Sequence, residues 1–404
     1  MRCGLLGRTL KHSYSPQIHE YLGDYSYQLF EQEPEELSAF FEKAEFNGIN
    51  VTIPYKKTVV PYCTRLSPIA EALGSVNTIV RNEDGSLIGH NTDYFGFMSM
   101  VKRTGIKISG KKVLVLGTGG ASVTVCAVLK ELQANTVQIS RTGPNNYENL
   151  HLHEDAALIV NATPVGMYPE NGVSPIDLSQ FKKLEGVLDL IYNPAATKLI
   201  MDAQRLGLKT ENGLWMLVAQ AKESAEWFTG KKIPDEVIEN IYLKLSGQMQ
   251  NIVLIGMPGS GKSTLGQLLA KETGRHFVDT DTEIENRINM SIPEFFSVQG
   301  EAAFRKVESE VLRDIGKQSG LVIATGGGCV TKQENYPPLH QNSRIVWVKR
   351  ALNELPIDGR PISQQTKAEE LYKIRRPLYE AFSDMCIDNN TTPEQAVDAI
   401  LAVL

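Results

Sequence analysis

The chain has 404 residues, of which 42% are hydrophobic and 22% are charged, and its formal net charge is −6. This length exceeds that of one ordinary core and predicts two or three domains of a soluble globular protein. Basic residues do not outnumber acidic ones, which disfavours a nucleic-acid partner. No apolar run is long enough to indicate a membrane span or a signal peptide. Five scattered cysteines without a C-x-x-C pair indicate a reduced, cytoplasmic protein.

The first hundred residues alternate short apolar runs with polar loops, which is typical of an α/β domain. Ser13 and Ser15 lie in a loop after the run 3–6, where they can bind hydroxyl groups or cap the helix that Pro16 begins. Lys56 follows another predicted strand, and most lysines in such positions point into water. Two further polar clusters follow apolar runs, at residues 72–78 and 89–93. Repeated polar strand ends favour binding of a small polyhydroxylated molecule.

A glycine-rich loop follows the predicted strand 112–116 and leads into a helix through Leu132. Its sequence resembles a dinucleotide-binding loop, with Ser122 at the place of the third glycine or alanine. The next strand ends in Ser140-Arg141-Thr142, where NAD-specific folds place an acidic residue. An arginine there suits the 2′-phosphate of NADP, although it can also be a plain exposed arginine.

Three more strands, at 157–160, 186–190 and 209–210, complete the predicted sheet. A helix then begins near Leu214 and carries Gln220, and a final helix runs from about residue 234 to 245. Residues 247–250 are predicted to be a short polar linker.

Residues 251–265 combine a β-branched apolar run, the pattern G-x-x-x-x-G-K-S at 256–263 and a helical pattern. Small residues allow backbone N–H groups to surround an anion, and the helix adds its positive N-terminal end. In such a P-loop, Lys262 reaches the β- and γ-phosphates and the Ser263 hydroxyl ligates Mg²⁺. The alternative is an ordinary glycine-rich turn with an exposed lysine, and the flanking strand and helix favour the P-loop.

Beyond the P-loop, a strand ends in two carboxylates, Asp279 and Asp281, which suit Mg²⁺ and a substrate hydroxyl. Residues 291–312 are predicted to be a helix in which Glu301, Arg305 and Glu308 share one face, so surface ion pairing is the alternative reading. Glycines 326–328 follow a buried strand and allow backbone to approach a ligand closely.

These motifs resemble two consecutive enzymes of the shikimate pathway. Residues 1–246 are similar to shikimate dehydrogenase through 12–16, 50–56, 72–78, 91–93, 117–121, 140–142, 161–167 and 220–221. Residues 251–404 are similar to shikimate kinase through 256–264, 279–281, 300–305, 326–328, 360–361 and 375–379. The resemblance implies an α/β substrate lobe (about 1–100 plus 225–246), a Rossmann NADP lobe (about 101–224) and a P-loop α/β domain with a parallel sheet.

The first implied reaction is the NADPH-dependent reduction of 3-dehydroshikimate to shikimate. Hydride addition to a ketone leaves an alkoxide, which Lys56 can protonate while Asp93 orients the ammonium. By the family's pattern the substrate is held by Ser13, Ser15, Thr52, Asn77, Asp93, Tyr192 and Gln220. The same pattern assigns to NADP(H) the residues Gly117, Thr118, Gly119, Gly120, Ala121, Ser140, Arg141, Thr142, Leu190 and Gly213.

The second implied reaction is transfer of the ATP γ-phosphoryl group to shikimate. Lys262 neutralises phosphate charge, and Ser263 with Asp279, through water, holds Mg²⁺. Asp281 is the candidate base, and Arg305 and Arg375 suit the substrate carboxylate. Substrate binding also involves Gly327, and ATP binding is assigned to Gly259, Ser260, Gly261, Lys262, Ser263, Thr264 and Arg360.

Other substrates and roles stay open at this point. The first half can prefer quinate, and the second can be another P-loop kinase or a regulatory module that binds its nucleotide without turnover. The interval between Arg360 and Arg375, a few residues shorter than usual in the family, is where a regulatory role would apply. The partners expected are small molecules, with no nucleic acid and no membrane, and the sequence does not indicate an oligomeric state.

Overall fold

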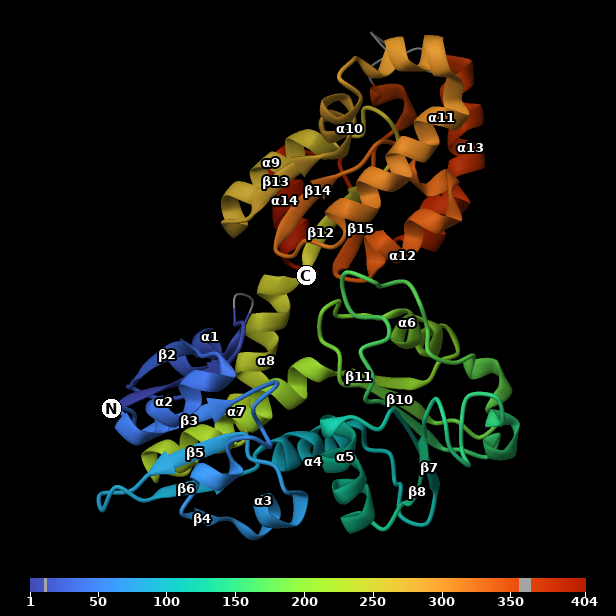
Figure 1. The fold of residues 1–404 in the computed structure, drawn as a ribbon. Coiled ribbons are helices and arrows are strands. Elements are labelled where there is room, and N and C mark those ends of the chain that lie inside the picture. Colours follow the sequence, from blue (N-terminus) through green and yellow to red (C-terminus); the bar gives the residue numbers. More distant parts are fainter. Residues whose placement is uncertain (11–12, 356–364) are drawn as a thin grey trace. The chain divides into compact units, whose positions relative to one another are not determined.

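The computed structural model describes residues 1–10, 13–355 and 365–404. The chain folds into two compact units. The first comprises Met1–Gly166, Val173–Tyr192 and Leu199–Leu245, and the second comprises Met167–Gly172, Asn193–Lys198 and Ser246–Leu404. Both are α/β, as predicted, and together they contain three sheets (Figure 1). Among the described residues, we find no helix with the length and apolar character that a membrane crossing requires.

The first sheet is mixed and six-stranded, in the order β2-β1-β3-β5-β6-β4. β1 is parallel to β2 and β3, whereas β5 is antiparallel to both of its neighbours. Its strands are β1 (Arg2–Gly7), β2 (Ser26–Glu31), β3 (Gly48–Val51), β4 (Arg65–Leu66), β5 (Thr78–Arg81) and β6 (Leu87–His90), and its helices are α1 (Ser15–Glu20), α2 (Leu37–Lys43) and α3 (Pro68–Leu73).

Side-chain alternation along β3 separates the apolar core of this lobe from its polar face. Ile49 and Val51 are buried in a core that also contains Leu6 and Ile79. Asn50 points to the opposite side of the sheet, because successive residues of a strand face opposite ways. The polar face of the lobe therefore begins at this residue.

The second sheet is parallel throughout, with the order β11-β10-β9-β7-β8. Its strands are β7 (Lys112–Leu116), β8 (Asn135–Ile139), β9 (Leu158–Asn161), β10 (Gly186–Asp189) and β11 (Lys209–Asn212), with the helices α5 (Gly120–Glu131) and α6 (Lys198–Arg205). The strand order reverses between β7 and β9, and such a switch point is where doubly wound sheets bind nucleotides. The predicted Rossmann lobe is confirmed.

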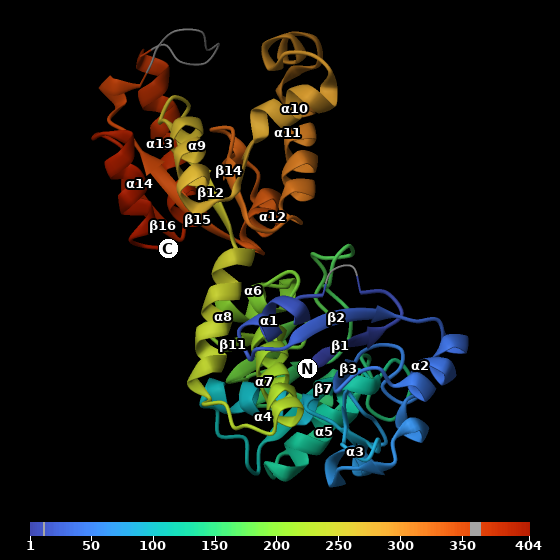
Figure 2. The same ribbon diagram turned by 90° about the vertical axis from the view of Figure 1, so that its left-hand side faces the viewer.

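Two helices, α4 (Asp93–Thr104) and α7 (Gly213–Thr229), connect the two lobes of the first unit. They pack side by side between the sheets (Figures 1 and 2). Near the end of α4, the Arg103 guanidinium lies 3.9 Å from the Trp215 ring centroid and 4.7 Å from that of Tyr242. It also pairs with Glu211 at 2.8 Å and with Glu239. One cation thus ties α4, α7 and β11 to helix α8 (Glu236–Met249).

The predicted linker 247–250 is wrong, because α8 continues to Met249 and the next strand begins at Asn251. Ile238, Ile241, Leu245 and Met249 are all buried. This spacing of three or four residues keeps an apolar stripe on one face of the helix past Gly247. Packing therefore outweighs the polar composition that indicated a linker.

The second unit contains a parallel five-stranded sheet, in the order β13-β14-β12-β15-β16. The strands are β12 (Asn251–Ile255), β13 (His276–Asp279), β14 (Leu321–Ala324), β15 (Ser343–Lys349) and β16 (Met385–Asp388). The helices are α9 (Lys262–Thr273), α10 (Thr280–Ile288), α11 (Ile292–Ile315), α12 (Tyr336–His340), α13 (Gln365–Phe382) and α14 (Pro393–Leu401).

Both faces of this sheet are covered, which explains the continuous apolar run in β12. Ile252 and Leu254 pack in one core with residues of α9 and α14. Val253 and Ile255 pack in another with residues of α11, α12 and α13. The polar ends of β12, β13 and β14 are then left at one edge of the sheet.

The predicted helix 291–312 is interrupted. Gly300 has φ 78° and ψ 173° inside α11, a conformation that residues with a Cβ rarely adopt. The chain kinks there, and Phe296 before the kink packs against Phe304 after it, with ring centroids 4.6 Å apart. Arg305 and Glu308 therefore lie on the segment after the kink.

Two candidate active sites

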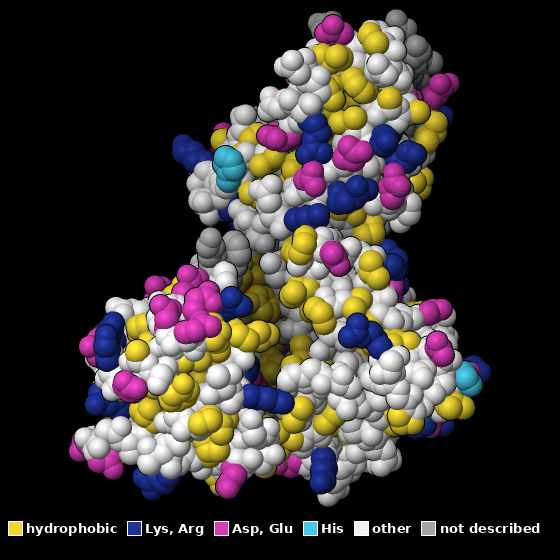
Figure 3. All heavy atoms as spheres, in the orientation of Figure 1, with side chains coloured by type: hydrophobic (Ala, Val, Ile, Leu, Met, Phe, Trp, Pro, Cys, Tyr) yellow, Lys and Arg dark blue, Asp and Glu magenta, His cyan; other side chains and the backbone are white. Residues whose placement is uncertain are grey.

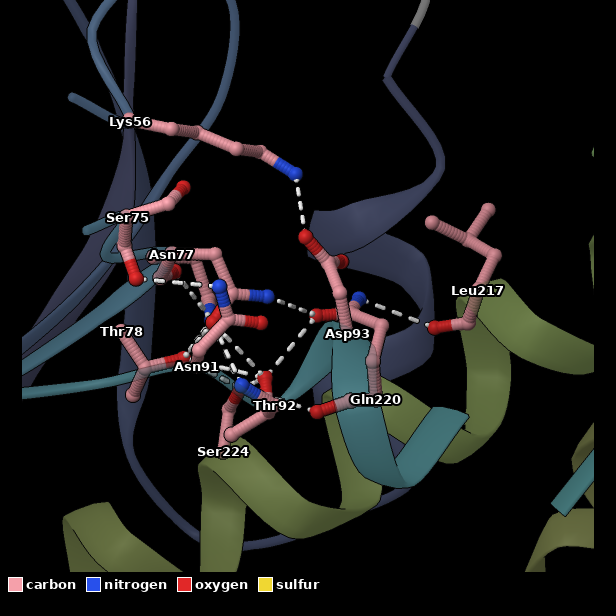
Figure 4. Close-up of polar contacts among 11 residues, drawn as sticks. Lys56, Ser75, Asn77, Thr78, Asn91, Thr92, Asp93, Leu217, Gln220 and Ser224 are labelled. Carbon is pink, nitrogen blue, oxygen red and sulfur yellow. Dashed lines mark hydrogen bonds and ion pairs between the residues drawn. The ribbon is translucent and has the colours of Figure 1, made fainter. Parts of the chain in front are cut away.

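Lys56 and Asp93 meet at the polar face of the first sheet. Lys56 follows β3, and Asp93 is the first residue of α4. Lys56 Nζ donates a hydrogen bond to Asp93 Oδ2 at 2.6 Å (Figure 4). The side chains are 32% and 16% exposed, so the pair is held by the fold but stays accessible to a ligand. On the face drawn in Figure 3, the first unit is hollowed between its two lobes.

Beside this pair, two amide side chains have their orientation set by a buried network. Asn77 Oδ1 accepts the Thr92 backbone N–H at 2.7 Å, so Asn77 Nδ2 faces the other way, toward Gln220 Oε1 at 3.5 Å. Gln220 Nε2 donates to the Leu217 carbonyl at 2.9 Å. Figure 4 draws Asn77, Gln220 and Asp93 in one cluster of polar side chains. The structure therefore brings together four of the predicted residues: Lys56, Asn77, Asp93 and Gln220.

The loop with the two serines lies at the junction of the lobes. The N-cap residue of α1 is Tyr14, whose own side chain makes no capping bond. Ser13 Oγ accepts the backbone N–H of Ser15, the first residue of this helix, at 3.2 Å. The ring of Tyr14 contacts that of Tyr192, from the second lobe, edge to face with centroids 6.1 Å apart. Burial, and then the neighbouring Tyr14, raise the pKa of Tyr192, which keeps its hydroxyl a hydrogen-bond donor.

Thr52, the remaining predicted substrate ligand, follows β3 and is half-buried. Its backbone N–H donates to the Leu6 carbonyl at 2.9 Å. The N-terminal lobe thus fixes the position of Thr52 through the backbone and leaves its side chain partly accessible.

The dinucleotide-type loop follows β7 at the switch point of the second sheet. Gly117 has φ 103°, and Thr118, Gly119, Gly120 and Ala121 are at least partly exposed. A Cβ on Gly119 or Gly120 would meet no atom within 4 Å, so space is open beside this backbone. Ser122 is fully buried and donates to the Gly119 carbonyl at 2.6 Å. Ser122 therefore stabilises the loop from its buried side.

Arg141 is exposed just after β8, with its neighbours Ser140 and Thr142 joined by a hydrogen bond from Ser140 Oγ to the Thr142 carbonyl. At the other side of the sheet, Gly213 abuts Leu190: a Cβ on Gly213 would overlap the Leu190 carbonyl oxygen. Only glycine allows this approach, which brings the predicted nicotinamide-side residues together.

The P-loop of the second unit wraps around its own lysine. Lys262 Nζ donates to the carbonyls of Gly256 and Met257 at 3.0 and 2.9 Å. Gly261, with φ 91°, is the N-cap residue of α9. Ser260 is buried, Gly259 is half-buried, and Ser263 and Thr264 are exposed. The backbone N–H groups at this helix start have the local structure that the P-loop prediction requires.

One hydroxyl and one carboxylate meet at the end of β13. Ser263 Oγ donates to Asp279 Oδ2 at 2.6 Å. The other oxygen, Asp279 Oδ1, accepts the Asp281 backbone N–H at 3.0 Å. This second contact aims the carboxylate at the P-loop.

Glycines 326–328 form the point on which the remaining predicted residues converge. A Cβ on Gly326 would lie 2.7 Å from Asp281 Oδ1, and one on Gly328 would overlap the Arg305 guanidinium. Arg375 Nη1 donates to the Gly327 carbonyl at 3.1 Å. The absent side chains at Gly326 and Gly328 thus make room for Asp281 and Arg305, and Arg375 joins them at the Gly327 carbonyl.

Glu308 is a residue whose burial the sequence did not reveal. It is 1% exposed and pairs with Arg305 at 2.8 Å, while exposed Glu301 pairs with the same guanidinium at 3.3 Å. The predicted ion pairing along this helix is therefore present. It is not surface pairing, because Arg305 and Glu308 are both buried. Burial raises the pKa of Glu308; the Arg305 guanidinium opposes this shift, the carboxylate of Asp281 adds to it, and Arg375 opposes it. The i,i+3 spacing to Arg305 was the available signal.

Comparison with known proteins agrees with the division of the chain into two units. Residues 5–79 match the model of the shikimate dehydrogenase substrate binding domain, and residues 213–241 match that of the shikimate 5′-dehydrogenase C-terminal domain. A shikimate dehydrogenase (NADP(+)) of Clostridium perfringens strain SM101 is 36% identical over 265 residues, which cover 60% of this chain and 97% of that protein. The chain belongs to the shikimate dehydrogenase family.

The dehydrogenase part also resembles solved structures. Shikimate dehydrogenase 1 of Peptoclostridium difficile is 37% identical with a TM-score of 0.56, covering 61% of this chain and 98% of that one. The Thermus thermophilus enzyme, solved with NADP(H) and shikimate, is 30% identical with a TM-score of 0.55, covering 60% and 99%. A chorismate mutase/shikimate 5-dehydrogenase fusion of Clostridium acetobutylicum is 33% identical with a TM-score of 0.57, covering 61% and 97%.

The C-terminal part has a separate match. Residues 258–404 match the shikimate kinase model. The chain is therefore a fusion of a shikimate dehydrogenase with a shikimate kinase domain, as the sequence motifs indicated. Of the predicted kinase residues, Arg360 lies outside the described residues, so its place in the site stays a prediction.

Proposed function

We propose that this chain carries out two consecutive steps of the shikimate pathway: NADPH-dependent reduction of 3-dehydroshikimate to shikimate, then ATP-dependent phosphorylation of shikimate. The ion pair between Lys56 and Asp93 carries the first assignment. The convergence of Asp281, Arg305 and Arg375 on glycines 326–328 carries the second.

In the reductase, bound NADPH would supply the hydride that reduces the carbonyl carbon of the substrate. Lys56 donates a proton to the oxygen, which becomes the hydroxyl of shikimate, and Asp93 orients the ammonium and balances its charge. A catalytic acid needs hydrogen-bond reach to the reacting oxygen, and the partly exposed Lys56 Nζ supplies it.

Several polar groups are suited to hold the substrate. Asn77 Nδ2 is a donor and Gln220 Oε1 an acceptor for its hydroxyls, as their fixed amide orientations require. We assign its carboxylate to the hydroxyls of Ser13, Ser15, Thr52 and Tyr192. The ring contact between Tyr14 and Tyr192 supports this, because it brings hydroxyls from both lobes to one place.

The nucleotide lobe fits NADP(H). Open space beside Gly119 and Gly120 leaves room for a pyrophosphate against the backbone, at the N-terminus of α5. Exposed Arg141 is suited to the 2′-phosphate, with Ser140 and Thr142 beside it. Gly213 and Leu190 are assigned to the nicotinamide end.

The kinase site fits ATP with Mg²⁺. Lys262 and the backbone of residues 259–264 are suited to phosphate, and Arg360 is assigned to ATP. Ser263 Oγ and Asp279 Oδ2 form a hard oxygen pair at 2.6 Å, the ligand type that Mg²⁺ requires, with Asp279 acting through water. In phosphoryl transfer, Asp281 accepts the proton of the substrate hydroxyl, while Arg305 and Arg375 hold the carboxylate beside Gly327.

A coupled assay of the full chain tests both assignments. We expect NADPH consumption on addition of 3-dehydroshikimate, and ADP formation only once shikimate has been formed. If the enzyme oxidises quinate in preference to shikimate in the reverse reaction, quinate replaces shikimate as the assigned product of the reductase. Normal reduction without any ADP would instead make the second unit a nucleotide-binding regulatory module.

Cellular context follows from simpler observations. Each of the five cysteines, all of them among the described residues, carries a free thiol. Free thiols suit a reducing compartment, so we place the enzyme in the cytoplasm. Its proposed partners are the small substrates and nucleotides.

A further inference from the structure

Ser224 is a buried hydroxyl on α7 that contacts four polar groups. Its Oγ accepts from Asn50 Nδ2 at 2.7 Å, contacts the hydroxyls of Thr78 and Thr92 at 2.9 Å each, and lies 2.9 Å from the Gln220 carbonyl. Ser224 is completely buried, and Figure 4 draws its contacts with the threonines and with Gln220. It has no direct contact with Lys56 or Asp93 in the network drawn there.

The hydroxyls beside Ser224 in turn contact the two amides of the substrate site. Thr92 Oγ1 lies 3.2 Å from Asn77 Oδ1 and 3.4 Å from Gln220 Oε1. Thr78 Oγ1 donates to Asn77 Oδ1 at 3.1 Å. These contacts form one continuous chain from Ser224 to both amide groups.

We propose that Ser224 is a positioning residue that acts through Thr92 and Thr78 to fix the amide orientations of Asn77 and Gln220. This inference rests on the proposed dehydrogenase function. A hydroxyl has one proton and two acceptor sites, and Asn50 Nδ2, a donor only, occupies one acceptor site of Ser224. The Ser224 proton goes to the Gln220 carbonyl, so its remaining acceptor site takes the proton of one threonine and thereby helps to determine where the threonine protons point.

The threonine protons matter because they help decide which end of each amide faces the substrate. With one threonine donating to Ser224, the other donates to Asn77 Oδ1, so that oxygen stays inward and Nδ2 faces the site. Without the Ser224 hydroxyl, Asn50 Nδ2 loses its shortest acceptor and competes for the threonine oxygens. A network that is only partly satisfied no longer specifies one arrangement.

Ser224→Ala removes the hydroxyl alone. We expect KM for shikimate to rise about tenfold with kcat within about threefold of wild type, the size of one lost hydrogen bond in a buried network. KM for NADP⁺ stays unchanged, because the network does not touch the nucleotide lobe. Mere partial unfolding would lower apparent kcat and leave KM for shikimate unchanged, and that result overturns the proposal.

A matched control is Thr229→Val on the same helix. Thr229 Oγ1 donates to the Ala225 carbonyl at 2.7 Å, the same i→i−4 bond that Ser224 makes to Gln220, but outside the network. Its KM for shikimate is expected to equal that of wild type. Equal KM increases in both variants would show that any lost hydroxyl on α7 has this effect, and would overturn the proposal.

Thr92→Val provides the second test, because it breaks the same chain at the next residue. We expect the double variant with Ser224→Ala to raise KM no more than the larger single change, since coupled residues are not additive. Multiplied effects would contradict the proposal. If wild type itself fails to reduce 3-dehydroshikimate, the proposed function fails; if wild type is active and Ser224→Ala behaves like it, only this inference fails.

Discussion

The Nζ of Lys56 lies 2.6 Å from Oδ2 of Asp93, and this pair joins the loop after β3 to the first turn of α4. Because α4 is one of the two helices that connect the lobes, the candidate acid is fixed at their junction. Its neighbour Lys57 is exposed and serves as a matched residue.

Lys56→Ala is expected to lower kcat for 3-dehydroshikimate reduction by about 10²- to 10⁴-fold, because the alkoxide loses its proton donor. KM changes little, and Lys57→Ala keeps wild-type rates. Steady-state kinetics at saturating NADPH measures this, and the unchanged KM reports on folding of the first unit, which contains Lys56. Most of the turnover surviving at unchanged KM would falsify the assignment.

A substitution of Arg305 tests the kinase site, but the burial of Arg305 makes its removal costly to stability. Arg305→Ala would leave Glu308 buried without its ion pair, which typically costs about 3–5 kcal/mol of stability. Arg305→Lys keeps the charge but loses the planar fork. We expect it to raise KM for shikimate about tenfold and leave KM for ATP nearly unchanged.

The control for this variant is Arg313→Lys, an exposed arginine on the same helix, which should keep both KM values. Equal increases of both KM values in Arg305→Lys count against a carboxylate-binding role. Isothermal titration with shikimate alone provides an independent measurement.

Arg141 determines the choice between the two nicotinamide dinucleotides in our proposal. Arg141→Ala should raise KM for NADP⁺ by about 10- to 100-fold, as expected for a lost hydrogen bond to a charged phosphate, without affecting KM for NAD⁺. Exposed Lys130 on α5 provides the control, Lys130→Ala. An unchanged ratio of the two KM values would rule out the phosphate contact.

Ser263→Ala tests the metal assignment. Loss of one oxygen ligand should increase the Mg²⁺ concentration required for half-maximal kinase rate by about tenfold. Thr273→Val, on the same helix but bonded only to the Leu269 carbonyl among its described contacts, should keep the wild-type requirement. Titration of Mg²⁺ at constant ATP measures this. A lower kcat with an unchanged Mg²⁺ requirement would speak against the assignment.

His90 makes the first unit sensitive to acid. Burial lowers the pKa of His90 from 6.5 to about 4, and its ring stacks on Trp227 with centroids 3.7 Å apart. The unfolded chain therefore binds a proton near pH 6.5 before the folded one does, so stability is lost as pH falls from 6.5 toward 4. Between pH 7.5 and 5.5 the loss from this residue is about 1 kcal/mol.

His90→Phe keeps a ring against Trp227 and removes the proton site, so the pH dependence should shrink by that amount. Urea unfolding in a Trp347→Phe background measures it, since the remaining tryptophans, 215 and 227, both lie in the first unit. An identical pH dependence with and without His90 would contradict the prediction.

Much of the fold could be predicted because the motifs have fixed structural contexts. The loop 117–121 and the P-loop each require a strand before and a helix after, and both are found. Boundaries set by packing could not be predicted: the apolar stripe that extends α8 to Met249 is visible only once its neighbours are known.

The candidate sites also contain residues that could be predicted from the sequence and residues that could not. Lys56 and Asp93 could be identified because they lie in motifs that resemble those of the family. Ser224 and Glu308 could not, because an ordinary serine and an ordinary helical glutamate become informative only through burial and contacts from distant parts of the chain. Sequence separation between Ser224 and Asn50 alone is 174 residues.

The contacts of Arg103 with α8 determine where a fragment that contains only the reductase should end. A fragment that stops before Glu239 strips this guanidinium of one carboxylate and of the Tyr242 ring, at the place where α4, α7 and β11 meet. Attempts to express the reductase alone should therefore keep α8 through Met249, even though motif matching to the dehydrogenase ends earlier, at residue 241.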